Sequence, residues 1–160
     1  MSVSKTQFYK ALSVIKSDNC NIPFPQVLST GTNTSVTASA LVNTSGDFVN
    51  LGVQIGDIVY NTTDGTAATV TAVVSATQLT LNANIFTATS KSYTIYQANS
   101  LSGYSNGGCC LYVGGGGTVV VTTLGGDVVT FAAVPTGTIL PVQVVKLASA
   151  STATSVIALW

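Results

Sequence analysis

The C-terminal third of the chain consists of short runs of β-branched residues, separated by glycine, proline and hydroxyl-bearing residues. The runs TVVVTT and VVTFAAV stand on either side of Gly125, Gly126 and Asp127, which supply the positive φ angles that a tight hairpin turn needs. We therefore expect residues 110–160 to form a compact module of antiparallel strands, closed by a last strand that carries Trp160.

The longest run of this module, residues 138–147, is largely apolar on both of its alternating faces. A strand with two apolar faces is typical of a strand that is covered on both sides. We expect it to lie between two layers or at a contact between subunits. The candidate core or subunit-contact residues are Ile139, Leu140, Val142, Val144 and Trp160.

Residues 31–98 contain a second series of strand signals. Alternating apolar and polar residues or β-branched residues mark three of these strands, SVTASALV, Asp57–Tyr60 and SYTIYQ. We expect a hairpin across Ser75 and Ala76, formed by AATVTAVV and TQLTL. Short strands at close spacing predict a small sandwich or barrel-like module.

Residues 2–20 carry the one helical period of the chain, because Phe8, Leu12 and Ile15 recur at the spacing of one helix face. We expect this helix or arm to pack on its own β module, on a neighbouring subunit or on a scaffold. Its lysines suit an acidic partner, although three lysines on a short helix can equally be its solvated face. The candidate docking residues are Lys5, Phe8, Lys10, Leu12, Ile15 and Phe24.

The expected fold is all-β, with two small antiparallel modules behind a short N-terminal helix or arm. Residues 1–30 form the arm and a proline-containing linker, residues 31–98 the first module, residues 99–109 a polar joint, and residues 110–160 the second module. In an alternative organisation, the first module is an insertion in a domain whose edge strand comes from residues 21–30.

Charged residues make up only 6% of the chain, and the net charge is zero. A neutral surface fits either a stable monomeric domain or a protein whose apolar area is covered by neighbouring subunits, and we favour the second reading. Nucleic acid is not expected as a partner, because phosphate binding needs clustered cations. A membrane is not expected either, since no run of about 18 apolar residues exists.

The residues needed for common catalytic sites are missing or placed in turns. Histidine is absent, and four of the five aspartates stand beside glycine, where they stabilise turns. The run Gly114–Gly117 is followed by a strand pattern and not by the helix of a phosphate-binding loop. We therefore expect no catalytic residues, no cofactor and no metal. The three cysteines, Cys20, Cys109 and Cys110, are expected to be buried thiols.

Three pieces of the C-terminal module carry a resemblance to a known family. The opening LYVG (Leu111 to Gly114), the core VPTGTILPV (Val134 to Val142) and the terminal VIALW (Val156 to Trp160) look like the head-spike-base proteins of gene-transfer agents. They also resemble the related capsid-decoration proteins of tailed bacteriophages. The string DFVNLGVQIGDIVYNTTDGTAATVTAV resembles a β module common in phage virion proteins.

The resemblance implies a non-enzymatic virion protein on the outer surface of a capsid, assembled in the host bacterial cytoplasm. Its implied partners are the major capsid protein, further copies of itself in a closed ring (a trimer before a pentamer), and a spike or fibre protein. The alternatives are a tail, neck or baseplate component and a receptor- or glycan-binding adhesin. The adhesin reading rests on the tyrosines and Trp160, which could line a sugar-binding surface.

Overall fold

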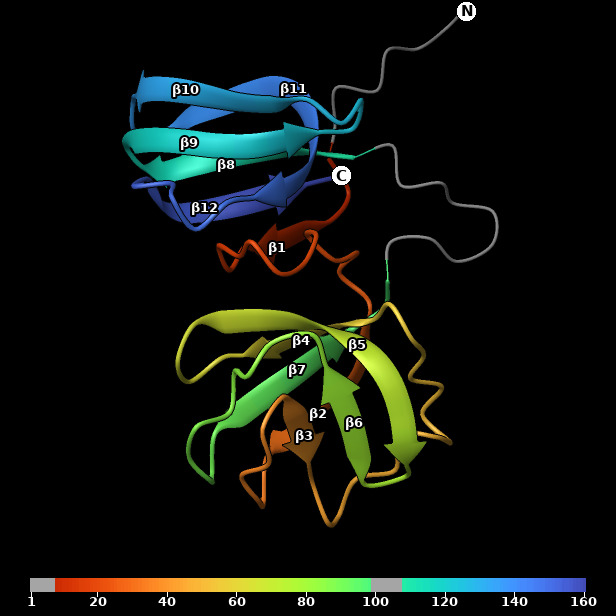
Figure 1. Cartoon of the computed structure of the whole chain (residues 1–160). Helices are drawn as coiled ribbons and strands as arrows, with labels where there is room; N and C mark the ends of the chain where they lie inside the picture. The colour runs from red at the N-terminus through yellow and green to blue at the C-terminus, as the bar shows by residue number, and fades with distance from the viewer. Residues whose placement is uncertain (1–7, 99–107) are drawn as a thin grey trace, which may run out of the picture. The chain divides into compact units, whose positions relative to one another are not determined.

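The computed structural model describes residues 8–98 and 108–160, which form twelve β-strands and no helix. The strands divide between two antiparallel sheets of six strands each, so the expected all-β fold with two antiparallel modules is confirmed. Figure 1 shows the two sheets and the course of the chain through them. Lys5 and most of the expected polar joint, residues 99–107, lie outside the described residues.

The chain divides into two compact units that are not continuous in sequence. The first unit comprises residues 15–98, and the second unit combines residues 8–14 with residues 108–160. The first unit is therefore inserted in the sequence of the second, and the strand that precedes the insertion comes from residues 11–13.

The sheet of the second unit follows the order β1-β12-β8-β11-β9-β10. Figure 1 shows β10 at one margin of this sheet, beside β9. The hairpin expected around residues 125–127 is confirmed, because the strands on either side of it pair antiparallel. The strands are β1 (Ala11–Ser13), β8 (Cys109–Gly115), β9 (Gly117–Thr123), β10 (Val128–Val134), β11 (Thr138–Leu147) and β12 (Thr154–Leu159).

The core of the second unit is built from alternate residues of its strands. A strand directs successive side chains to opposite faces, so buried and less buried residues alternate in the middle of β8, β9 and β12. Small and β-branched side chains fill this interior. Its buried members include Leu111, Val113, Val119, Val121, Val144, Leu147, Val156 and Ala158.

Strand β11 departs from the regular alternation that its sequence predicts. Its register shifts between Leu140 and Val144, in a stretch that contains Pro141, a residue that cannot donate a backbone hydrogen bond. As a result Leu140, Val144 and Leu147 are buried, whereas Ile139 remains exposed. Of the expected core or subunit-contact residues of β11, Leu140 and Val144 therefore lie in the core, and Val142 is half-buried.

The glycine run of residues 114–117 allows strand β12 to approach β8 closely. A Cβ atom on Gly114 would lie 2.7 Å from the backbone oxygen of Ser155, which is too close for any larger residue. The run lies at the junction of β8 and β9, and the amide of Gly116 donates to Oγ1 of Thr136 at 2.9 Å. The strand expected after this run is present as β9, but the run itself forms the end of β8 and the start of β9 and not a turn of four residues.

The N-terminal segment forms an edge strand, so the predicted helix is wrong for residues 8–20. Residues 9–14 hydrogen-bond along β12, and the amide of Val14 donates to the backbone oxygen of Val156 at 2.9 Å. An isolated helix of two turns is marginal in water, whereas pairing with an existing strand satisfies the backbone at once. Leu12 is buried in this arrangement, and the helical spacing of Phe8, Leu12 and Ile15 is not used.

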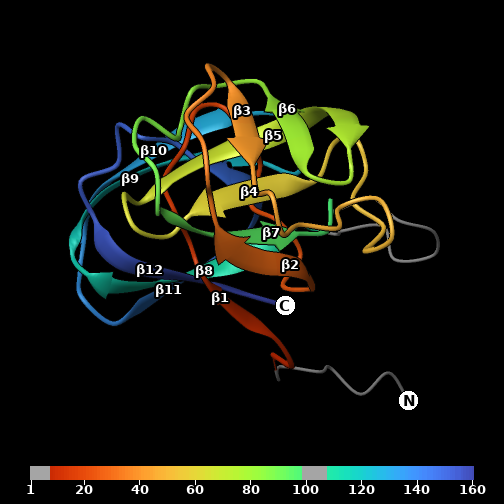
Figure 2. The ribbon, with the colours of Figure 1, turned by 90° about the horizontal axis from the view of Figure 1, so that it is seen from below.

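The sheet of the first unit follows the order β2-β7-β4-β5-β6-β3 and curls into a half-barrel. Figure 2 shows these strands side by side in this order. The two edges of the curl meet at one end, because the amide of Thr34 donates to the backbone oxygen of Val42 and Ser35 forms a bridge with Val42. The strands are β2 (Val27–Thr32), β3 (Ala40–Val42), β4 (Ile58–Asn61), β5 (Thr66–Ser75), β6 (Gln78–Leu81) and β7 (Ser92–Tyr96).

Most strands expected in this region are present. The expected hairpin of β5 and β6 is confirmed, and the run SYTIYQ corresponds to β7. The run SVTASALV is a strand only over its last three residues, because residues 36–39 lie in the connection to β3. Residues 27–30, predicted to be linker, belong to the edge strand β2.

Large side chains fill the concave side of the half-barrel. Phe48, Phe86 and Tyr93 are fully or almost fully buried, and the rings of Phe48 and Tyr93 meet edge to face with centroids 6.1 Å apart. The Tyr93 hydroxyl accepts a hydrogen bond from Nδ2 of Asn43 at 2.8 Å. The other core residues are Leu41, Val53, Val59, Ala68, Val70, Leu79, Leu81, Ile85 and Ile95.

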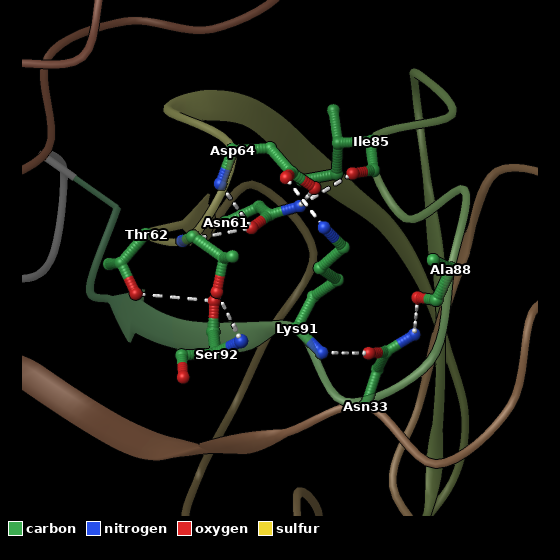
Figure 3. Close-up of polar contacts among 9 residues, drawn as sticks. Asn33, Asn61, Thr62, Asp64, Ile85, Ala88, Lys91 and Ser92 are labelled. Carbon is green, nitrogen blue, oxygen red and sulfur yellow. Dashed lines mark hydrogen bonds and ion pairs between the residues drawn. The ribbon is translucent and has the colours of Figure 1, made fainter.

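Buried asparagines fasten the loops of the first unit, as Figure 3 shows. The Nδ2 atom of Asn61 donates to Oδ2 of Asp64 and to the backbone oxygen of Ile85, and its Oδ1 atom accepts from the amides of Thr63 and Asp64. Lys91 completes the cluster by an ion pair of 2.8 Å with Oδ1 of Asp64. The side chain of Asn61 is therefore fully hydrogen-bonded, which offsets the cost of burying it.

We expect Asn61→Ala to lower the unfolding free energy of the first unit by about 2–4 kcal/mol, because it removes four hydrogen bonds and leaves the backbone oxygen of the buried Ile85 without this donor. Urea unfolding followed by circular dichroism measures the loss. Asn50→Ala is the matched control, since Asn50 is exposed and its side chain bonds only Asp47, and it should change stability by less than about 0.5 kcal/mol. Equal effects of the two variants would contradict the assigned role of Asn61.

Candidate assembly surface

The loop between β3 and β4 exposes large aliphatic side chains to solvent. We call residues 47–57 the apolar loop. Within it Val49, Leu51 and Ile55 are 55%, 46% and 70% exposed, whereas Phe48 and Val53 point into the core. Exposed aliphatic residues that are clustered on one loop, and not scattered singly, mark a surface that can bind a partner.

The backbone of the apolar loop is held by hydrogen bonds. The amide of Phe48 donates to the backbone oxygen of Ala76, and the amide of Val53 donates back to the oxygen of Phe48. Gly52 and Gly56 adopt positive φ angles of 75° and 99°, which larger residues adopt only with strain. The loop thus presents its aliphatic side chains on a fixed backbone, and little conformational entropy remains to be lost on binding.

Asp57 anchors the end of this loop. Its Oδ2 atom accepts the amide of Gln54 at 2.7 Å, and its Oδ1 atom accepts the amide of Ala98 at 2.6 Å. The side chain is almost completely buried, and burial raises the pKa of its carboxyl, while the two backbone hydrogen bonds act in the opposite direction. Asp57 therefore ties the loop to the end of β7 and adds no charge to the surface.

The pKa of Asp64 is shifted in the opposite direction to that of Asp57. The hydrogen bonds from Lys91 and Asn61 hold the pKa of the Asp64 carboxyl below its ordinary value. Both charges of the Lys91–Asp64 pair are thereby compensated within the first unit. The neutral surface expected from composition is made more uniform by this pairing and by the burial of Asp57.

The second candidate surface is the outer edge of strand β10. Among the described residues, β9 is the one strand that pairs with β10. Val128 is 73% exposed, and Val129 and Phe131 are only half-buried although their partners Val121 and Val119 belong to the core. Unprotected strand edges pair readily with other chains.

The residues predicted to dock do not form one cluster within either unit. Phe8, Lys10 and Leu12 belong to the second unit, whereas Ile15 and Phe24 belong to the first. Leu12 is buried by its own sheet, Phe8 is 44% exposed, and Lys10, Ile15 and Phe24 are half-buried. The structure thus brings Phe8 and Lys10 together beside the end of β12, where the amide of Lys10 and the backbone oxygen of Trp160 hydrogen-bond.

The predicted contact residues of the C-terminal module also differ in how far they are exposed. Leu140 and Val144 are core residues of the second unit, and Val142 and Trp160 are half-buried. Ile139 is the member of this set that is exposed, at 47%. Neither the apolar loop nor the edge of β10 was predicted as a surface. The usable signal was a group of aliphatic residues between glycines 46 and 56.

Several groups with potential chemistry lie in the interior. Tyr60 and Tyr93, which could have lined a sugar-binding surface, are buried, and the rings of Tyr60 and Tyr96 meet edge to face. Cys20 and Cys109 are buried, as expected, whereas Cys110 is half-buried. Burial raises the pKa of the Cys109 thiol to about 12, which keeps it protonated and unreactive at neutral pH.

Within residues 8–98 and 108–160, no three cysteine or aspartate side chains come together as potential metal ligands. The same residues include no helix suited to crossing a bilayer. Comparison with protein-family models, with curated proteins and with solved structures found no match to this chain.

We expect the stability of the first unit to decrease as the pH rises through the raised pKa of Asp57. A folded-state pKa above the ordinary value of 3.8 means that the folded unit binds the proton more tightly than the unfolded chain. This stabilisation is complete below the unfolded pKa and is lost as the pH rises through the folded pKa. Urea unfolding at a series of pH values measures the dependence, which Asp57→Asn should remove.

Asp64→Asn is the control for this experiment. The pKa of Asp64 is lowered, so its stabilisation is present above 3.8 and is lost as the pH falls through the folded pKa. Asp64→Asn should therefore leave the decrease at higher pH unchanged. Persistence of that decrease in Asp57→Asn would show that another group causes it.

Proposed function

We propose that the protein is a non-enzymatic structural component of a virion, binding the outer surface of a capsid as a decoration or cement protein or as the base of a head spike. Its partners are the major capsid protein, further copies of itself and, at a spike, a fibre protein. The C-terminal motifs that resemble head-spike-base proteins suggest the setting. The apolar loop is the observation that carries the proposal, because it supplies a preformed surface for a protein partner.

The physical basis of the attachment is burial of the loop's aliphatic side chains. Fully burying one isoleucine or leucine side chain is worth about 1.5–3 kcal/mol, and the fixed backbone limits the entropy lost. One loop therefore binds weakly, but many identical copies on a symmetric shell reinforce one another through multivalency. A protein that binds only the assembled shell stabilises that shell by linkage.

The charge distribution suits such an array. Neighbouring copies on a shell lie close together, and a large net charge would make them repel each other. Here the net charge is zero, Asp57 is buried, and Lys91 is paired with Asp64. Copies can therefore pack side by side without an electrostatic penalty, and their attachment should depend little on salt.

We expect Ile55→Ser to reduce the amount of protein bound to particles by about tenfold, because it removes the most exposed aliphatic side chain of the apolar loop. Particles are purified on a density gradient from the cells that produce the protein, and quantitative mass spectrometry gives the copy number. Val74→Ser is the matched control, since Val74 is an exposed aliphatic residue of the same unit outside the loop.

Absence of the wild-type protein from every particle band would overturn the proposed function. Equal losses in Ile55→Ser and Val74→Ser would show that the apolar loop has no special role in attachment. Washing the particles in about 1 M salt separates apolar from ionic attachment, because exposed ion pairs are screened at that concentration. Release by salt would favour docking through Lys10 and Lys16 over docking through the loop.

A further inference from the structure

The edge of strand β10 has a defined set of backbone groups that face away from its own sheet. The amide of Thr123 donates to the backbone oxygen of Asp127 at 2.8 Å, which makes these two residues a hydrogen-bonded pair. Hydrogen-bonded and non-hydrogen-bonded pairs alternate along an antiparallel ladder. Val129 and Phe131 therefore direct their backbone groups toward β9, and Val128 and Thr130 direct theirs outward.

The backbone of β9 supports this assignment independently. The backbone oxygen of Val120, the residue opposite Thr130, accepts the amide of Ala148 at 2.9 Å, and the amide of Val120 donates to Oγ of Ser151. Val120 thus uses its backbone groups on the side away from β10. The pairing of β9 with β10 leaves the amide and carbonyl of Thr130 pointing outward.

We propose that the edge of β10 pairs with β10 of a second copy of this chain, antiparallel and centred on Thr130. In this register Thr130 faces Thr130 of the other copy, and Val128 faces Ala132, so outward-pointing backbone groups meet each other. On the inner face Val129 stands opposite Phe131. Each half-buried Phe131 ring then gains a β-branched neighbour, a favourable cross-strand combination.

Charge and strand geometry favour a second copy as the occupant. Residues 128–134 carry no charged side chain, and the pairing sets Asp127 opposite Ala133, so no like charges meet. A bulge limits the pairing at the other end, because Ala133 has a φ of 50° and the register with β9 shifts between Phe131 and Val134. The part of β10 that can pair is therefore short and carries no charge, so an identical edge can pair with it without repulsion.

The opposite edge of the same sheet is a poorer partner. Strand β1 has three residues, against seven in β10, and it offers correspondingly fewer backbone groups. Pairing of β10 with β10 generates a two-fold contact, whereas pairing of β10 with β1 would join copies head to tail. The two-fold contact differs from the three-fold ring expected from the resemblance, so a ring on a capsid would use other surfaces. The β10 contact adds a partner surface to the proposed function, and its placement on a capsid rests on that proposed function.

A charge-swap experiment tests the register. Thr130→Lys and Thr130→Glu each place like charges on residues that face each other across the two-fold axis, with Cα atoms about 5.5 Å apart, and each should weaken dimerisation by about tenfold or more. An equimolar mixture of the two variants should recover the dimer, because opposite charges then face each other. Sedimentation velocity over a range of concentrations measures association, and circular dichroism verifies folding.

Ala150→Lys is the matched control, because it adds the same charge at an exposed turn of the same unit and should leave the dimer unchanged. A wild-type protein that is monomeric at all concentrations, or a dimer that Thr130→Lys does not weaken, would overturn the proposal. Two weakened variants without recovery in the mixture would overturn the two-fold register. If the protein dimerises in solution but binds no particle, the capsid role is refuted and the pairing is not. If the protein binds particles but does not dimerise, the pairing is refuted and the capsid role is not.

Discussion

Backbone hydrogen bonding between strands is the interaction on which this structure depends, and each sheet must deal with the two edges where that bonding ends. The first unit curls until its edges meet, because residues 34 and 35 pair with Val42. The second unit covers one edge with the short strand β1 and ends at β10 on the other. The two units therefore treat their sheet edges differently, and within the described residues β10 of the second unit offers a seven-residue edge for pairing with another chain.

A chain with few ionic groups must satisfy its buried polar groups by other means. In the first unit asparagine side chains take this role, because a carboxamide both donates and accepts hydrogen bonds without the desolvation cost of a charge. The side chain of Asn33 accepts a hydrogen bond from the amide of Lys91 and donates to the backbone oxygens of Ser35 and Ala88. The side chain of Asn43 donates to the hydroxyl of Tyr93. The loops are thereby fixed, and the surface remains nearly neutral.

The strands and hairpins were predictable from the sequence because their signals are local. Glycines at 125 and 126 favour a turn, and runs of β-branched residues such as TVVVTT predict the strands on either side of it. The N-terminal segment was not predictable in this way, since its conformation depends on the edge of β12, more than a hundred residues away in sequence. The candidate surfaces were missed for the same reason. A run such as VVTFAAV has the composition of a buried strand, and only the order of strands in the sheet places β10 at an edge.

The proposed pairing of β10 with a second copy would be weak between two isolated chains. Five residues of strand pairing bury little area, so an isolated pair of chains gains only a small free energy beyond the cost of association. When copies are held at high local concentration on a scaffold, that cost is largely removed, and the same contact becomes effective. In the proposed array, a weak, neutral and self-complementary edge would be better suited than a strong one, because it would limit association before the chain binds a shell. The exposed Val128 and the half-buried Phe131 are consistent with this balance.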